Sequence, residues 1–371
     1  MKKVFLTIFK LWVWVMVSGL LNNCTSVSAE KDLSQTTAVE IDKPSHHTVE
    51  GFQNNPAIKS SRRTGVNFIL RRIWYSIFPL EMKNDYIIDE AESLKQLKDK
   101  QGANTITWLG HASFLIRREG KAILTDPHLT NWAAPFPGVG PLRYSPPGIS
   151  IENLPPIDMV VISHNHYDHL SRDTLKRLPN KSRIHIIVPL GMKPIFVDMG
   201  YTLINELDWH ESISIDGIQF RALPSVHHSG RGLFDMNESL WASWLIRSNN
   251  ENLYFAGDTA YSKELFEDIG HSYGPFEWAM LPIGAYLPRE TMKNNHVNPQ
   301  EAVQIGIDIK AKNLVAMHWG TFNLTDEPPE EPPKLFLAAG KELNYASDAL
   351  WLMKIGETRY LTRPRALVSS Q

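Results

Sequence analysis

IDMVVISHNHYDHL, residues 157–170, is the segment from which the architecture and chemistry of this chain are most readily inferred. Its apolar run 159–162 has the length and β-branched content of a buried strand, and the run ends at Ser163. Four potential metal ligands follow within six residues: His164, His166, Asp168 and His169. Zn²⁺ accepts imidazole nitrogens and carboxylate oxygens in catalytic sites, so this loop predicts a metal site at the end of a strand.

Three later apolar runs end in the same kinds of residue. Residues 218–223 lead to His227 and His228, residues 252–256 lead to Asp258, and residues 314–317 lead to His318. In α/β proteins, binding sites lie at the carboxyl ends of the strands. Short β-rich runs alternate with helical segments from about residue 104 onward. The sequence therefore predicts an α/β layered fold with these ligand candidates gathered at one edge.

Composition argues against several other classes of protein. The chain has 371 residues, which suits one large α/β domain with extensions or two domains of ordinary size. Its 38 basic and 40 acidic side chains nearly cancel, so nucleic-acid binding driven by bulk positive charge is not expected. A single cysteine excludes a disulfide framework and a thiolate metal cluster, so any metal must be held by histidines and acids.

The N-terminus has the layout of a secretory signal. Lys2 and Lys3 precede the apolar run 11–21, which is shorter than the roughly 20 apolar residues that a transmembrane helix needs. We therefore expect an exported protein of the cell envelope. Two forms remain open. Cleavage after Ala29 would give a periplasmic chain, whereas lipidation of Cys24 or an uncleaved segment would give a membrane-anchored one.

These patterns divide the chain into four parts. We predict a signal peptide or membrane anchor over residues 1–29, a flexible tether over 30–65, an N-terminal amphipathic extension over 66–103 and a catalytic domain over 104–371. The tether is rich in Ser, Thr, Asn and Lys and has no sustained period. In the extension, apolar side chains surround Arg71 and Arg72, which suits either a lipid interface or a helix packed on the core.

The ligand pattern carries a family resemblance. HNHYDH with a later histidine, Gly257-Asp258 and a final HWG resembles the metallo-β-lactamase-fold hydrolases, whose signature is HxHxDH. A longer collinear set closely resembles the N-acyl-phosphatidylethanolamine-hydrolysing phospholipases D of that fold. Its motifs are WLGHASFLI (108–116), LTDP (124–127), PPIDMVVISHNHYDHL (155–170), FAGDTAY (255–261), PIGAYLPR (282–289), HVNPQEAV (296–303), MHWGTF (317–322) and GETRYL (356–361).

The resemblance implies a four-layer αβ/βα sandwich with two zinc ions between its sheets. Carried over position by position, the ligands of one ion would be His164, His166 and His227, and those of the other Asp168, His169 and His318, with Asp258 bridging both. His228 departs from the family pattern, so its role stays open and His227 is the preferred ligand. Fe or Mn could replace zinc, because histidine and carboxylate sites bind these metals too.

Other residues in these motifs are candidates for supporting roles. Two divalent ions would activate a shared water as the nucleophile, and the sequence contains no Gly-x-Ser-x-Gly elbow that would supply a serine instead. Asp168 could shuttle the proton as well as bind metal, and His111 could line the site. For His296, substrate contact and a structural role are both open. We expect Asp126 to orient a ligand histidine.

The resemblance implies a phospholipid substrate with an N-acylated ethanolamine head group, cleaved to phosphatidic acid and an N-acylethanolamine at a membrane surface. It is also compatible with a homodimer. Trp132, Phe136 and the Pro-rich residues 134–147 could admit acyl chains, or they could belong to the core. Two other hypotheses remain. One is a lactonase, β-lactamase or phosphodiesterase acting on a soluble substrate, because one fold serves many reactions, and the other is a non-enzymatic envelope lipoprotein.

Overall fold

The computed structural model describes most of the chain from residue 44 onward. The described residues are 44–56, 70, 71, 74, 75, 78, 82, 84–136, 140–232 and 234–361, and they all belong to one unit, Pro44–Gln371. The predicted signal or anchor with Cys24, most of the predicted tether and part of the amphipathic extension lie outside them. No helix in the described part has the length and apolar composition needed to cross a membrane. The four domain boundaries stay predictions.

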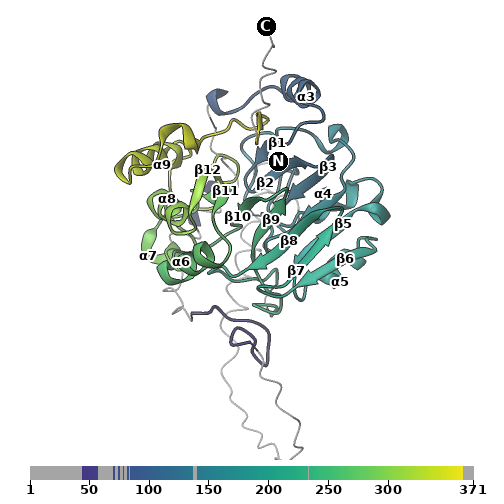
Figure 1. Ribbon diagram of the computed structural model, residues 1–371, viewed down its shortest axis with the longest axis horizontal. Coiled ribbons are helices and arrows are strands. Elements are labelled where there is room, and N and C mark those ends of the chain that lie inside the picture. The colour runs from purple at the N-terminus through teal and green to yellow at the C-terminus, as the bar shows by residue number, and fades with distance from the viewer. Residues whose placement is uncertain are drawn as a thin grey trace, which may run out of the picture. The chain divides into compact units, whose positions relative to one another are not determined.

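Two mixed β-sheets form the centre of the described region (Figure 1). The first has the strand order β14-β1-β2-β3-β4-β5-β6, and the second has the order β13-β12-β11-β10-β9-β8-β7. The strands of the first sheet are β1 (Thr105–Gly110), β2 (Ser113–Arg118), β3 (Lys121–Thr125), β4 (Met159–Val161), β5 (His185–Pro189), β6 (Leu203–Leu207) and β14 (Thr358–Tyr360). Those of the second are β7 (Ser212–Ile215), β8 (Ile218–Leu223), β9 (Ser243–Ser248), β10 (Glu251–Phe255), β11 (Phe276–Pro282), β12 (Ala311–Met317) and β13 (Leu350–Trp351).

Each sheet is antiparallel in one half and parallel in the other. Strands β14, β1, β2 and β3 pair antiparallel, and β3 to β6 pair parallel. In the second sheet β7 to β10 pair antiparallel, and β10 to β13 pair parallel. The parallel halves need crossover connections, which the helices supply.

Helices accompany both sheets. In the described residues they are α3 (Glu90–Asp99), α4 (Arg172–Arg177), α5 (Lys193–Val197), α6 (Lys263–Ser272), α7 (Arg289–Met292), α8 (Pro299–Asp308) and α9 (Glu331–Glu342), with the 3₁₀ turns η1 (Asn84–Tyr86), η2 (Ile151–Asn153), η3 (Lys181–Arg183) and η4 (Ser347–Ala349). Figure 1 shows α6 to α9 beside β11 and β12, and α5 next to β6. Helix α8 begins at a capping box in which Asn298 and Glu301 accept each other's backbone N–H groups.

The alternation of side chains along β4 explains the layers. Met159 and Val161 belong to the hydrophobic cluster that spans the two sheets, whereas Val160 and Ile162 belong to the cluster on the other face of the first sheet. That outer cluster includes Leu175 of α4 and Phe196 of α5. Because both faces are buried, the strand reads as a continuous apolar run. The predicted four-layer αβ/βα sandwich is confirmed.

The two sheets are tied together where β4 ends. The indole Nε1 of Trp244, on β9, donates to the carbonyl oxygen of Ile162 at 3.0 Å. One residue later, the Ala242 N–H donates to the Ser163 carbonyl at 2.9 Å. Trp244 is fully buried. These bonds fix the start of the histidine-rich loop against the second sheet.

Removing the Trp244 bond should destabilise the fold. In Trp244→Phe the Ile162 carbonyl stays buried without this donor, so we expect the free energy of unfolding to fall by about 1–3 kcal/mol. Urea denaturation measures the change. The control is Trp351→Phe, the same substitution at a half-buried residue of the edge strand β13. A loss no greater than the control's would contradict the role given to this bond.

Candidate metal centre

The candidate ligands lie in four loops, each at the carboxyl end of a strand. The loops follow β4, β8, β10 and β12, so two sheets contribute to one site. The structure brings every residue of the predicted ligand set into the resulting groups: His164, His166, Asp168, His169, His227, Asp258 and His318. Within each group, the potential ligand atoms lie within 4.8 Å of one another.

The first group contains three imidazoles. His164 Nε2 lies 2.8 Å from His166 Nδ1, and His227 Nε2 lies 3.2 Å from the same atom. Burial lowers the pKa of His164 and His227 well below the ordinary value and lowers that of His166 to about 3. All three rings are therefore neutral at pH 7, which is the form that binds metal.

The second group lies on the other side of Asp258. The His169 and His318 Nε2 atoms are 3.2 Å apart, and each is 3.4 Å from Asp168 Oδ2. His111 joins this group. Its Nε2 donates to Asp168 Oδ2 at 2.9 Å, so the same nitrogen is not free to bind a metal. The arrangement assigns His111 the task of holding Asp168.

Asp258 lies between the two groups. Its Oδ2 is 3.1 Å from His169 Nε2 and 3.7 Å from His227 Nε2, and its Oδ1 is 3.1 Å from His318 Nε2. Burial by itself raises the pKa of this carboxyl, but the positive charges of His169 and His318 outweigh burial and hold the pKa well below its ordinary value. Asp258 is therefore ionised and faces both sets of ligands.

Asp126 holds the rings of two ligands. His169 Nδ1 donates to Asp126 Oδ2 at 2.7 Å. The Ser163 hydroxyl donates to the same oxygen at 2.5 Å and accepts from His164 Nδ1 at 2.9 Å, while the Ser163 N–H donates to Asp126 Oδ1. Asp126 is fully buried. Each histidine thus has its Nδ1 engaged by an outer partner and turns Nε2 toward the centre, which is how metal-ligating histidines are oriented.

The donor atoms fit a bound cation. His227 Nδ1 donates to the Asn295 carbonyl at 2.9 Å, so the Nε2 atoms of His227 and His164 both present lone pairs. Both point at His166 Nδ1, which has at most one proton and can satisfy only one of them. In the second group Asp258 Oδ1 is buried without a hydrogen bond among the described residues, and the Asp258 and Asp168 carboxylates outweigh burial and raise the pKa of His318 to about 9. A cation in the first group would satisfy its excess of acceptors, and one in the second would replace the positive charge that these carboxylates favour.

Three of these residues have left-handed backbone conformations. The φ angles are +56° for His111, +34° for Asp126 and +61° for His318. Non-glycine residues rarely adopt this region, and when they do they cluster at functional sites. The surrounding backbone holds two of them together, because the His318 N–H donates to the His111 carbonyl at 3.0 Å.

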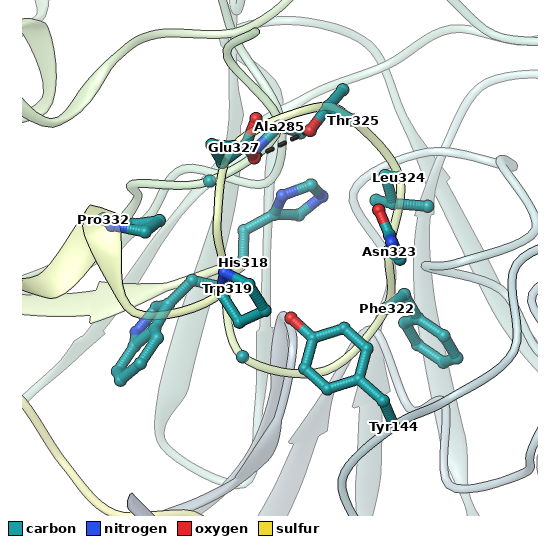
Figure 2. A pocket seen from close by; sticks show the side chains of 13 residues that line it. Tyr144, Ala285, His318, Trp319, Phe322, Asn323, Leu324, Thr325, Glu327 and Pro332 are labelled. Carbon is teal, nitrogen blue, oxygen red and sulfur yellow. Dashed lines mark hydrogen bonds between the residues drawn. The ribbon is translucent and has the colours of Figure 1, made fainter. Parts of the chain in front are cut away.

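The loop after β12 fixes the position of His318. Figure 2 shows His318 at the rim of a small pocket that Tyr144, Trp319 and Asn323 also line. The Glu327 carboxylate closes this loop by accepting from Ala285 N at 2.6 Å, Leu287 N at 3.1 Å and Thr325 Oγ1 at 2.7 Å. The space has room for about one water molecule, so it is a structural cavity and no substrate site.

His296 and His228 lie at the border of the site. His296 Nδ1 is 3.7 Å from Asp258 Oδ2 and is buried without a hydrogen bond among the described residues. Burial lowers the pKa of His296 to about 4, so the ring is neutral at pH 7. The His228 ring contacts that of His166, with centroids 4.6 Å apart. His296 is the better placed of the two to meet a substrate.

A groove of about 520 Å³ borders the histidine-rich loop. Asn165 and Tyr167, which flank His166, belong to its wall. Trp132, Pro135 and Phe136 form an apolar part, and the charged part contains two arginines, Arg172 and Arg231, and two acids, Asp173 and Asp235. Phe136 is 69% exposed, so it is no core residue.

Sequence analysis missed several supporting residues. It did not identify Ser163 and Asn295 as partners of the ligand rings, nor Asn54, whose side chain bonds the backbone of His227. It also missed a separate group of His46, His47 and Asp208. The adjacent histidines 46 and 47 in a polar tract were the available signal. Each of their Nε2 atoms meets a different Asp208 oxygen at hydrogen-bond length, 2.6 and 2.7 Å.

Comparison with known proteins agrees with this geometry. The profile of the Beta-lactamase superfamily domain matches residues 121–319, which include the ligand candidates from His164 to His318. The diiron β-hydroxylase CmlA from Streptomyces venezuelae has a similar fold, with a TM-score of 0.52 and 22% identity over 69% of this chain and 53% of that one. At that identity the likeness supports the fold alone.

Two curated relatives are more similar in sequence. The N-acyl-phosphatidylethanolamine-hydrolyzing phospholipase D 1 of Caenorhabditis elegans is 41% identical over 226 residues, which cover 58% of this chain and 64% of the relative. The mitochondrial enzyme of the same name from Saccharomyces cerevisiae is 35% identical over 290 residues, which cover 76% of this chain and 61% of the relative. The chain thus spans less than two thirds of the length of either relative.

Asp126→Asn should weaken metal binding. In the amide one of the two Asp126 oxygens is replaced by a donating NH₂ group, so either the Ser163 N–H or both the Ser163 hydroxyl and His169 Nδ1 lose their acceptor, and the rings of His164 and His169 lose their fixed orientation. We expect metal affinity to fall by about 10–100-fold, measured by competition with a chromophoric chelator. Asp173→Asn, at an exposed acid in the first turn of α4, is the control. Equal affinities for the two variants would refute the role of Asp126.

Gly257→Ala should separate the two sheets at the site. A Cβ at this position would lie 2.4 Å from Ser163 Cβ, and φ is +58°. Gly217 has a φ of +82° and open space around it, so Gly217→Ala introduces the backbone strain without the clash. We expect the control to lose about 1–2 kcal/mol of stability. Gly257→Ala should lose more stability and also bound metal, as measured by thermal unfolding and elemental analysis. Full metal content in Gly257→Ala would show that the close approach is not needed.

Proposed function

This chain belongs to the beta-lactamase superfamily of metal-dependent hydrolases, and on that premise we propose that it hydrolyses the phosphodiester of N-acyl-phosphatidylethanolamine-type phospholipids. The observation that carries the proposal is the position of Asp258 between two groups of ligands, which suits a pair of ions. The activity named for the two curated relatives supports the choice of substrate.

The residues divide into two coordination sets. His164, His166 and His227 would hold one zinc ion, Asp168, His169 and His318 the other, and Asp258 would contact both. Such a pair of ions lowers the pKa of a water toward neutrality and neutralises charge on a phosphodiester. The protein orients these ligands through Asp126, Asn295 and His111.

Two residues are available for substrate and proton handling. His296 is neutral at pH 7 and lies beside Asp258, with 12% of its side chain exposed to meet a bound substrate. The Asp168 carboxylate accepts from His111 and stays partly accessible, with 15% of its side chain exposed. His169 and His111 outweigh burial and hold the pKa of Asp168 well below its ordinary value, so we assign to this carboxylate the passage of a proton from the attacking water to the leaving oxygen, in addition to its place in the ligand set.

The groove beside the site has the chemistry of an amphiphilic substrate. Arg172 and Arg231 would face a phosphate, and the apolar wall formed by Trp132 and Phe136 would face acyl chains. Phe234, which lies between the lining residues Gly232 and Asp235 in the sequence, is 92% exposed and would add an apolar contact for such a substrate. The volume of the groove, about 520 Å³, lies within the range of small-molecule sites.

A second apolar surface supports action at a membrane. Leu70, Trp74 and Phe78 are spaced four residues apart and are 57%, 58% and 53% exposed. The Phe78 N–H donates to the Trp74 carbonyl at 2.9 Å, as in a helical turn, and the rings of Trp74 and Phe78 have centroids 4.4 Å apart, so these two side chains share one face. An apolar helical face turned to solvent suits insertion into a lipid interface.

Asp258→Asn tests the catalytic centre. The amide carries no charge to share between two ions, so we expect turnover of N-acyl-phosphatidylethanolamine vesicles to fall by at least about 100-fold with the fold intact. Mass spectrometry of phosphatidic acid and N-acylethanolamine measures the reaction. Asp268→Asn, at an exposed residue of α6, is the matched control and should keep full activity. Unchanged turnover in Asp258→Asn would defeat the assignment of Asp258.

The substrate is tested separately with a panel. Zinc-loaded wild-type protein is offered phospholipid vesicles, nitrocefin, an acyl-homoserine lactone and bis-nitrophenyl phosphate. We expect hydrolysis of the phospholipid to exceed that of the soluble compounds. Preference for a lactone or β-lactam would overturn the substrate but keep the metal centre. Elemental analysis of unsupplemented protein decides between zinc and iron.

A further inference from the structure

Asn54 forms a two-point contact with the backbone of a candidate metal ligand. Its side-chain oxygen accepts from the His227 N–H at 3.0 Å, and its side-chain amide donates to the His227 carbonyl at 2.8 Å. The two residues are 173 positions apart in the chain. An asparagine bonded in this way takes the place of a neighbouring strand. It fixes both the position and the orientation of the backbone to which it is bonded. The loop after β8 has no other strand at this point among the pairings of the described residues.

The segment that carries Asn54, residues 44–56, is anchored at its other end; we call it the strap. The His46 and His47 Nε2 atoms donate to the two oxygens of Asp208, at 2.6 and 2.7 Å. The His46 ring stacks on that of Trp209 with centroids 4.2 Å apart. Asp208 lies between β6 and β7, where the chain passes from the first sheet to the second.

The middle of the strap lies directly against the backbone of the loop after His227. The Phe52 N–H donates to the Asn237 carbonyl at 2.9 Å. A Cβ at Gly51 would lie 2.1 Å from that carbonyl oxygen, so only glycine permits the approach. The Asn237 N–H in turn donates to the Ser229 carbonyl at 3.1 Å. Strap and loop therefore form one hydrogen-bonded unit.

We propose that Asn54 is a positioning residue for His227 and that the strap is thereby a working part of the metal centre. The proposal rests on the proposed function only in taking His227 as a ligand. Asn54 holds the backbone of His227 while Asn295 holds its Nδ1, so the ring is constrained from both ends. Loss of the backbone contact lets the Nε2 atom drift from His164 and His166.

The consequence is confined to one half of the centre. Neither His169 nor His318 has a hydrogen bond to the strap among the contacts of the described residues, and both are held by other groups. Weakened metal binding should therefore affect the ion of His164, His166 and His227 and leave the other ion in place. A general loss of fold stability would instead weaken the binding of both ions together.

The test uses full-length Asn54→Leu and Asn54→Ala proteins loaded with Co²⁺. Leucine keeps the approximate size of asparagine and removes both hydrogen bonds, so it separates bonding from packing. We expect one of the two ions to bind about 10–100-fold more weakly in both variants, as measured by chelator competition. The visible absorption spectrum should lose the contribution of that ion. Asn55→Ala is the matched control, because the Asn55 side chain donates to the Ser45 hydroxyl within the strap and does not bond His227.

Asp208→Ala provides a second route to the same result. It releases the anchored end of the strap without touching Asn54, and we expect a smaller loss of affinity for the same ion. His210→Gln is its control, since His210 is exposed and bonds Tyr273 instead. Wild-type affinity for both ions in the two Asn54 variants would overturn the proposal, and so would equal weakening of both ions. Because metal binding is measured without substrate, a wrong phospholipid assignment leaves this result unaffected.

Discussion

The constraint on which the site depends is the burial of neutral imidazoles whose lone pairs face one another. His164 and His227 both turn Nε2 toward His166 Nδ1, whose single proton can satisfy only one of them. Such an arrangement is costly without a positive charge at its centre, because buried acceptors need partners. The bonds from His164 Nδ1 to Ser163 and from His227 Nδ1 to Asn295 maintain this arrangement, because they fix which nitrogen of each ring carries the proton.

The sandwich follows from that requirement. Ligands come from both sheets, so the sheets must be held at a fixed separation at this end. The bond from Trp244 to the Ile162 carbonyl and the close approach of Gly257 to Ser163 perform this task. Asp126 then connects the first sheet to ligands of both groups, which makes a single buried carboxylate responsible for the alignment of His164 and His169.

Substrate handling depends on surfaces outside this rigid centre. The groove combines guanidinium groups with aromatic side chains next to the histidine-rich loop. Exposed apolar residues include Trp74 in the N-terminal amphipathic extension and Phe234. The protein thus combines a mostly buried set of candidate ligands with an amphiphilic groove beside it. The strap, residues 44–56, contacts the site at His227 through Asn54, so an N-terminal segment of the chain supports one of the candidate ligands.

The sequence by itself determined the layered fold and the identity of the ligand candidates. Both are local properties: continuous apolar runs predict strands, and each ligand candidate lies in the loop that follows such a run. Apart from Asp126, which sequence analysis expected to orient a ligand, only the tertiary structure decided which groups hold the ligands in place. Asn54 and His227 are 173 residues apart, and Asp208 is 162 from His46. Contacts of that kind arise from the way the sheets and loops pack in space, and no spacing or periodicity in the chain encodes them.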